Sequence, residues 1–408
     1  MFSKKQLFIL SFVLAILFHF LFYFQTYGPN LAMLDGYIIY TLAIASAVLM
    51  MVIYFFTKWR LELKGNISLL LYEALVMWIF ISFIRSIIQM NEIRDLVPFL
   101  FYNFLGISLF PVLFFTVGVS VGYVKTINRI LTFYILFAFT ISLFFLDRFE
   151  MQIFLLMPIF YLIITIPLRS RWEGTLIMII SIVLIIISLT NRAGVLRILM
   201  SYCILAAMYI AKTMKISKRL IKFAVFCLLL IPIISLYFGI QGRSVFQIVL
   251  GEDIQPYSQM NPFADTRTLL YYEVFQDLRV NKAFLFGKGL NASYSSVSFT
   301  TFNRPVVEVG FLHLLLKTGI VGCLLYFSVL VTAIFKSIGR SKSFFIKSLG
   351  LLLVGYGLMF FIENILAYNL LNIIIWIIIG MCLSDRMRGL TDMEIQSLFS
   401  SPRHTVRL

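Results

Sequence analysis

The chain has 408 residues, of which 61% are hydrophobic and only 13% are charged, whereas a soluble domain is nearer half apolar and about a quarter charged. With a mean hydropathy of +0.98, this composition excludes an ordinary soluble protein and indicates a polytopic membrane protein. The formal net charge of +16 would suggest a nucleic-acid partner in a soluble protein. In a membrane protein the excess is expected in cytoplasmic loops, so the bilayer is the expected partner and nucleic acid is not.

Twelve apolar runs are each about long enough to cross a bilayer as a helix, which takes about 20 residues. They lie near residues 6–24, 36–57, 66–84, 97–123, 130–146, 151–168, 175–190, 193–211, 220–238, 318–335, 348–364 and 369–384. The stretch 175–211 is too long for one helix, and "TNR" at 190–192 is its polar break, so we expect a hairpin there. The sequence therefore predicts an all-α polytopic integral membrane protein with about 12 transmembrane helices.

The basic residues orient these helices. If the N-terminus is inside, 22 of the 34 Lys and Arg residues fall in inside segments, as the positive-inside rule requires. The predicted layout is helices one to nine over 1–238, a large periplasmic loop over 239–317, helices ten to twelve over 318–384, and a cytoplasmic tail over 385–408. Both termini are then cytoplasmic. The other 12 basic residues fall on the outer side, where topology alone does not require them.

The predicted loop contains short helices of its own. Loops this long in a compact protein are commonly functional. Asp265 is expected to cap a helix, along which Leu270, Val274 and Leu278 recur at the spacing of an amphipathic helix. The stretch "FLFGKGLNASYSS" predicts a glycine turn, and "PVVEVGFLHLLLKTGIVG" predicts a shallow helix that leads into the tenth span.

The outer arginines are candidates for binding an anionic group, because a guanidinium binds phosphate bidentately. Arg192 lies at the hairpin and Arg197 lies in the apolar run, with no acid beside them. The plainer interpretation is that Arg192 caps the hairpin in the headgroup layer and that Arg197 snorkels. Arg267 lies in the first turn of the loop helix, where it either faces a phosphate together with the helix N-terminus or pairs with Asp265.

Glu308 is the candidate general base toward a sugar hydroxyl, because it is the only acid between Asp277 and Glu363. Its plainer interpretation is an ion pair with Arg304, one helical turn earlier. His313 lies among leucines and is either a substrate contact or a packed side chain.

Three further features complete the candidate site. Glu73, in the third span, is either a functional intramembrane acid or a partner for a neighbouring helix. Lys288, in the glycine turn, is a further candidate substrate contact, as are Arg197 and Arg304. The sequence has no P-loop, GxGxxG, HExxH, Cys/His cluster or Asp-x-Asp pair, so the site is expected to use neither metal nor any other cofactor.

Three stretches resemble the O-antigen polymerase and ligase superfamily, the Wzy-type membrane glycosyltransferases. "SLTNRAGVL" is similar to that family's Ser-Arg-x-x-x-Leu signature at the end of a span. "TRTLLYYEVFQDLRVNKAFLFGKG" is similar to its loop pattern, in which an arginine opens a helix that a Gly-x-Gly turn follows. "VEVGFLHLLLKTGIVG" resembles the segment that leads into the next span and ends in Gly-x-x-Gly. The resemblance covers roughly residues 186–335, and the first half matches only in its number of helices.

The residue at one position separates the two activities of this superfamily. Its ligases have a histidine eleven residues before the first glycine of the last motif, and counting back from Gly319 gives Glu308. His313 is not at that position. The resemblance therefore implies a polymerase in which Arg192, Arg267 and Glu308 are the catalytic residues.

The resemblance also implies the substrates and the location of this polymerase. Its donor and acceptor would be glycans linked to undecaprenyl pyrophosphate, polymerised on the periplasmic face of a bacterial inner membrane, with a chain-length regulator of the same pathway as a partner. An O-antigen ligase and a lipid-linked oligosaccharide flippase are the alternatives. A flippase also has about twelve helices, but it needs cations along a central cavity and no long outer loop.

Overall fold

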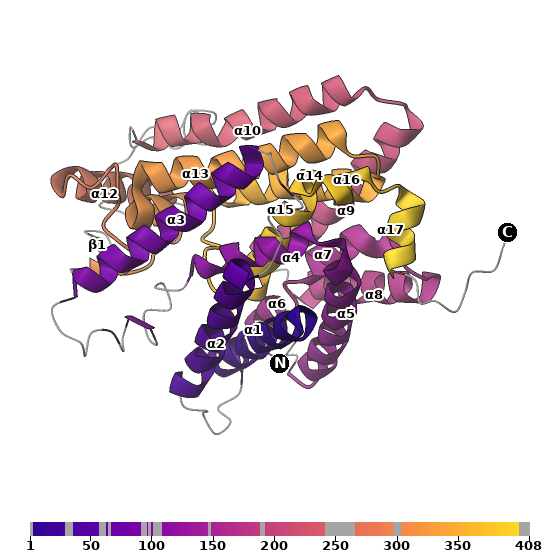
Figure 1. The fold of residues 1–408 in the computed structure, drawn as a ribbon, viewed down its shortest axis with the longest axis horizontal. Helices are drawn as coiled ribbons and strands as arrows, with labels where there is room; N and C mark the ends of the chain where they lie inside the picture. Colours follow the sequence, from indigo (N-terminus) through magenta and orange to yellow (C-terminus); the bar gives the residue numbers. More distant parts are fainter. Residues whose placement is uncertain are drawn as a thin grey trace.

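A computed structural model of the chain describes residues 3–28, 36–56, 63, 67–90, 96, 99–100, 108–145, 148–187, 192–240, 266–296 and 303–399. Within these ranges the regular secondary structure is helical apart from one two-stranded sheet (Figure 1). The expected all-α class is confirmed for this part of the chain.

The helices follow one another closely along the chain. Their bounds are α1 (Lys4–Tyr27), α2 (Gly36–Phe56), α3 (Ile67–Ile88), η5 (Phe110–Phe114), α4 (Phe115–Val119), α5 (Val121–Leu143), α6 (Phe149–Leu155), α7 (Ile159–Thr165), η6 (Ile166–Leu168), α8 (Arg171–Ile187), α9 (Arg192–Thr213), α10 (Lys218–Ile240), α12 (Thr266–Val280), α13 (Gly310–Arg340), α14 (Phe344–Met359), α15 (Leu370–Leu383), α16 (Asp385–Gly389) and α17 (Asp392–Phe399). The strands β1 (Tyr294–Ser295) and β2 (Asn303–Arg304) pair antiparallel, with Tyr294 opposite Arg304.

Six of the described helices are long and apolar enough to cross a membrane: α1, α2, α3, α5, α9 and α13. Shorter apolar helical stretches occur at 110–119 and 159–168 and in α14 and α15. With 16 residues, α14 is about 24 Å long, which is less than the roughly 30 Å of a hydrocarbon core. The membrane character is thus supported, whereas the count of twelve spans and their orientation stay predictions.

Two predicted local features are confirmed. Helix α8 ends at Ile187 and α9 begins at Arg192, so the long apolar run contains two helices, and residues 188–191 between them lie outside the described part of the structure. Helix α12 occupies the expected loop helix, and Leu270, Val274 and Leu278 are all fully buried. Both outcomes follow from short-range signals, a polar interruption and a helical repeat of apolar residues.

The expected shallow helix and the tenth span form one helix, α13, with a kink at Gly319. There the backbone has φ 70° and ψ −173°, a conformation that is essentially restricted to glycine. The shallow helix therefore continues into the long apolar helix, with a change of direction at Gly319.

Helices α10, α13 and α3 run side by side along the longest axis of the molecule (Figure 1). Helices α14 and α15 pack against α13, and every residue of α15 is buried, as expected for a helix that is apolar all round. Helix α12 and β1 lie at one end of this axis and α17 lies at the other.

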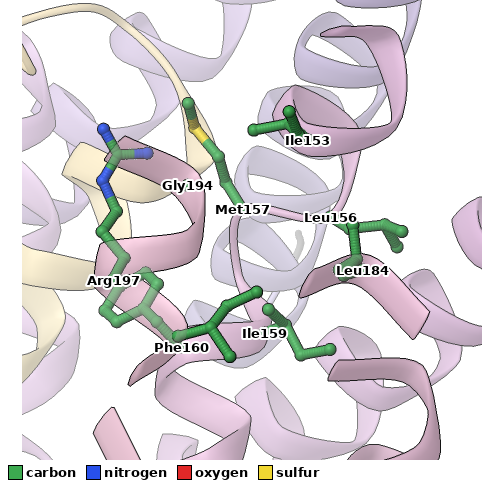
Figure 2. A pocket seen from close by; sticks show the side chains of 9 residues that line it. Ile153, Leu156, Met157, Ile159, Phe160, Leu184, Gly194 and Arg197 are labelled. Atoms are coloured by element: carbon green, nitrogen blue, oxygen red, sulfur yellow. The ribbon is translucent and has the colours of Figure 1, made fainter. Parts of the chain in front are cut away.

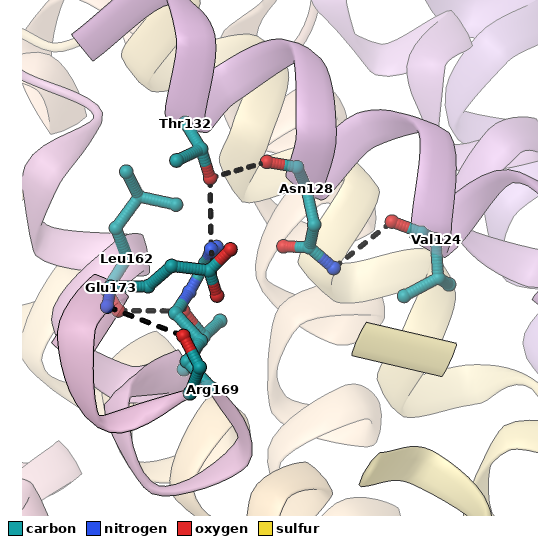
Figure 3. Close-up of polar contacts among 8 residues, drawn as sticks. Val124, Asn128, Thr132, Leu162, Arg169 and Glu173 are labelled. Carbon is teal, nitrogen blue, oxygen red and sulfur yellow. Dashed lines mark hydrogen bonds and ion pairs between the residues drawn. The ribbon is translucent and has the colours of Figure 1, made fainter. Parts of the chain in front are cut away.

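A buried arginine joins three helices at another point of the bundle (Figure 3). Arg169 follows η6; its Nε donates to Thr165 Oγ1 at 2.7 Å, and its Nη1 donates to Thr132 Oγ1 of α5 at 2.9 Å. It also lies 3.9 Å from the carboxylate of Glu173 in α8. Arg169 is one of the basic residues on the predicted inner side, and these contacts fix the α7–α8 connection to α5.

Candidate functional site

The segment 360–364, which follows α14, connects the parts of the chain that contain the candidate residues. It holds the start of α13 through two backbone hydrogen bonds, from Phe311 N to Phe360 O at 3.0 Å and from Gly310 N to Glu363 O at 3.2 Å. Asn364 Nδ2 donates to Val307 O at 2.8 Å, directly beside Glu308. The stretch that carries Glu308 is therefore fixed to this segment.

Helix α12 is attached to the same segment. Tyr271 Oη donates to Phe361 O at 3.1 Å. Arg267 precedes Tyr271 by four residues, about 6 Å along the helix axis, so its backbone lies near this end of the bundle. The side chain of Arg267 lies outside the described part of the structure.

The first turns of α9 reach the segment through an ion pair between Arg197 and Glu363. Arg197 is only 8% exposed, and the Glu363 side chain is 27% exposed. The pairing differs from both sequence-based interpretations of Arg197, which were a snorkelling residue or a phosphate ligand. Arg192 opens the same helix five residues earlier, and its side chain falls outside the described part.

Apolar side chains surround the buried Arg197 of α9. Figure 2 shows Arg197 at the edge of a small pocket of about 20 Å³, lined by Ile153, Leu156, Met157, Ile159, Phe160, Leu184, Gly194 and Ile198. A second small pocket, also of about 20 Å³, shares Arg197 and Phe160 with the first and continues toward α14 and α15. In this low-dielectric setting an arginine requires a partner, and Glu363 provides it.

Glu308 forms the expected ion pair with Arg304, at 3.2 Å from its Nη2. The Glu308 side chain is nevertheless 53% exposed. Because an exposed pair of this kind is weak and easily rearranged, the carboxylate remains accessible to a substrate hydroxyl. The pairing and the proposed role as a base are therefore compatible.

A second carboxylate, Glu273, lies close to this pair. Glu273 of α12 is 8% exposed and interacts electrostatically with Tyr294, as do Arg304 and Glu308. Burial raises the pKa of Tyr294 above its usual value, so its hydroxyl stays protonated. Sequence reasoning did not select Glu273, although its place beside Val274, at the edge of the apolar stripe of α12, could have indicated it.

Cations on the predicted outer side also hold the glycine turn against α3 and α12. Arg85 donates from Nη1 to Phe286 O at 2.8 Å and from Nη2 to Gly287 O at 3.1 Å. Lys288 Nζ donates to Asp277 Oδ2 at 2.8 Å and to Ser293 O at 2.7 Å. These contacts account for Arg85 and Lys288 without a ligand.

The turn docks at the kink of α13. Lys288 N donates to Leu316 O and Ile320 N donates to Phe284 O, both at 2.8 Å. The backbone amides and carbonyls that the kink at Gly319 leaves without helical partners are thus used by the turn. Lys317, which is 1% exposed, donates to the carbonyl of Ala292. Two of the three family-like stretches are therefore in direct contact.

Two other candidates have structural surroundings. His313 is fully buried, and its Nδ1 accepts a hydrogen bond from Val307 N at 3.3 Å, so it is packed and supports the backbone next to Glu308. Glu73 is half-buried on α3, twelve residues from Arg85, which corresponds to about 18 Å along that helix. Glu73 is therefore far along α3 from the glycine turn, which contains Lys288 and which Arg85 contacts.

No group of three or more His, Cys, Asp or Glu side chains that could hold a metal ion occurs among the described residues. Comparisons with protein-family models, with curated proteins and with solved structures give no match to this chain. The family resemblance therefore rests on the three sequence stretches themselves.

Proposed function

We propose that this chain is a metal-independent glycosyltransferase that polymerises oligosaccharide repeat units carried on undecaprenyl pyrophosphate, on the periplasmic face of a bacterial inner membrane. The observation that carries the proposal is the meeting of three separate stretches at the segment 360–364. The start of α9, helix α12 and the backbone beside Glu308 are all attached to it.

In the proposed reaction a hydroxyl of the lipid-linked acceptor attacks C1 of the donor glycan. A new C1–O bond forms, the bond from C1 to the pyrophosphate breaks, and undecaprenyl pyrophosphate leaves with the electron pair. Arg192 and Arg267 bind the pyrophosphate and stabilise the charge that grows on it. Glu308 accepts the proton of the attacking hydroxyl. Because Arg197 pairs with Glu363, its role in this scheme is to hold α9 in place.

The surroundings of Arg197 suit a lipid donor. The side chains beside it are almost entirely apolar, which suits the neighbourhood of a polyprenyl chain whose pyrophosphate lies near the start of α9. A chain-length regulator of the same pathway is the proposed protein partner, in keeping with the family resemblance.

The test is a deletion of the gene in a strain that makes a smooth surface glycan, complemented with single variants. We expect R192A, R267A and E308Q to leave core glycan with one repeat unit while the protein still inserts. R279A is the matched control, since Arg279 lies exposed in the last turn of the same helix as Arg267, and it should restore the full ladder. Long chains in R192A and R267A would refute the pyrophosphate role.

The deletion itself distinguishes the alternative activities. A lost polymerase leaves a single repeat unit on the core. A lost ligase leaves bare core and an accumulating lipid-linked polymer, and a lost flippase leaves no outer-face intermediate. Either of the last two patterns would replace the polymerase proposal.

A further inference from the structure

A lysine-rich pocket lies at the opposite end of the helix bundle from the segment 360–364. It has a volume of about 310 Å³ and lies between the end of α9, the start of α10, the α13–α14 turn and α17. Five lysines line it: Lys212, Lys215, Lys218, Lys342 and Lys347. Along α13, its lining residue Ile338 is 19 residues from the kink at Gly319, or about 28 Å. The pocket and the proposed glycosyltransferase site are therefore well separated.

The charge of this lysine pocket is poorly compensated by the protein. Asp392 is the only acid among its described lining residues, and its Oδ1 accepts a hydrogen bond from Phe344 N at 2.7 Å. None of the five lysines forms an ion pair within 4.0 Å among the described residues. Lys347 is within electrostatic range of both Lys218 and Asp392, and Glu394 is within range of Lys342. Five positive charges against one negative charge in the lining leave a surplus of four, which an anionic ligand would neutralise.

The backbone at Lys215 gives an independent indication. Lys215 has φ 51°, in the left-handed region, at the end of α9, where Ile216 N donates to Ala211 O at 2.9 Å. Glycine is the favoured residue at this position of such a helix end, because it lacks a Cβ. The chain instead has a lysine there, and that lysine lines the pocket.

The rest of the lining is apolar, and it determines the kind of anion that fits. The apolar residues are Met208, Ala211, Ile216, Ile221, Ile338, Phe344 and Leu351. Helices α9 and α13, both long enough to cross a membrane, have their C-terminal ends here, so the pocket is at headgroup level. A ligand with a phosphate for the lysines and acyl chains for the apolar floor matches this lining.

We propose that the lysine pocket binds the phosphate headgroup of an anionic glycerophospholipid from the leaflet on that side of the membrane. Basic pockets between helix ends are a known form of lipid headgroup site. The bound lipid would join α9, α10, α13 and α14 at the end of the bundle where their charges otherwise repel one another. This inference depends on the membrane character of the chain and is independent of the proposed glycosyltransferase activity.

The test is thermal unfolding of the purified full-length protein in a neutral detergent with added lipid. Phosphatidylglycerol should raise the midpoint of unfolding, whereas phosphatidylcholine with the same acyl chains should not. A lysine close to a lipid headgroup contributes roughly fivefold in affinity. We therefore expect the K212A/K218A/K347A variant to bind phosphatidylglycerol about a hundredfold more weakly.

A glycine substitution separates ligand binding from folding. K215G relieves the left-handed strain, so without lipid it should unfold at the same temperature as the native protein or higher, yet bind phosphatidylglycerol about fivefold more weakly. Lys282 is the matched control, because it also has φ 51° after a helix end, where Ala283 N donates to Leu278 O at 2.9 Å. K282G should leave the affinity unchanged.

Three results would overturn the proposal. One is native-like phosphatidylglycerol affinity in both K215G and the triple variant. Another is equal protection by phosphatidylcholine, which would mean that any amphiphile suffices. The third is equal protection by inorganic phosphate or pyrophosphate at the same concentration, which would assign the pocket to a free phosphate compound.

Discussion

Replacing Glu363 with glutamine should destabilise the protein more than replacing Arg197 with methionine, although both changes break the same ion pair. The asymmetry follows from burial. Arg197 is 8% exposed, so in E363Q its charge stays in an apolar setting without a counter-charge. The Glu363 side chain is 27% exposed, so in R197M the carboxylate can take up water. Methionine also fills most of the volume of the arginine stem.

The expected magnitudes follow from these exposures. Leaving one member of a buried pair uncompensated costs about 3–5 kcal/mol, and the glutamine oxygen of E363Q can still accept a hydrogen bond from Arg197, so we expect about 3 kcal/mol. For R197M we expect about 1–2 kcal/mol, because the remaining carboxylate is partly hydrated. The double variant R197M/E363Q should cost about 1 kcal/mol, well below E363Q and no more than R197M, because it leaves no isolated charge.

The measurement is reversible unfolding in mixed micelles of neutral detergent and increasing SDS, arranged as a double-mutant cycle. Arg304 and Glu308 provide the control cycle, since they form an exposed pair at 3.2 Å whose coupling should be below about 0.5 kcal/mol. If R197M costs as much as E363Q, or if the double variant costs the sum of the two single ones, then the burial difference does not govern this pair.

Three other substitutions have defined outcomes. Gly319→Ala should lower the free energy of unfolding by about 3 kcal/mol or more. The backbone angles φ 70° and ψ −173° are essentially restricted to glycine, and the added Cβ would lie 2.3 Å from a backbone oxygen. Unfolding in SDS measures this loss. Asn369→Ala removes the side-chain cap of α15 and should cost about 1 kcal/mol in the same assay. Lys288→Met leaves the carboxylate of Asp277 without its ion-pair partner and should lower the unfolding midpoint. If the variant still gives a full glycan ladder at low growth temperature, the role of Lys288 is structural.

Features that depend on neighbouring residues could be predicted from the sequence. The ion pair of Arg304 with Glu308 joins residues only four apart. The start of α9 at Arg192 follows a polar tripeptide, and the buried face of α12 follows from its apolar repeat. Helix packing was harder to predict, because a short interrupted helix and a spanning helix can have equally apolar sequences. Six of the described helices are long and apolar enough to cross a membrane, and the count of twelve spans stays a prediction.

The partner of Arg197 could not be predicted in this way. Glu363 is 166 residues away, and it was noted only as the next acid after Glu308. An arginine and an acid that each stand alone in apolar runs could have been considered together, because an isolated charge in a bilayer usually has a partner. Glu273 was missed for a related reason, since only the tertiary structure brings it within electrostatic range of Tyr294.

The sequence by itself determined that this is a helical membrane protein with an excess of basic residues, and it indicated which stretches contain candidate chemistry. Those conclusions depend on composition and short-range periodicity, which act within a few residues. Only the tertiary structure decided which charges have partners. The start of α9, helix α12 and the Glu308 stretch meet at the segment 360–364, and five lysines from separate helix ends surround one pocket. Such contacts form because a buried polar group is stable only with a hydrogen-bond or ion-pair partner, and because apolar helix faces pack against one another. The residues that make these contacts are far apart in the chain, so short-range patterns do not reveal them.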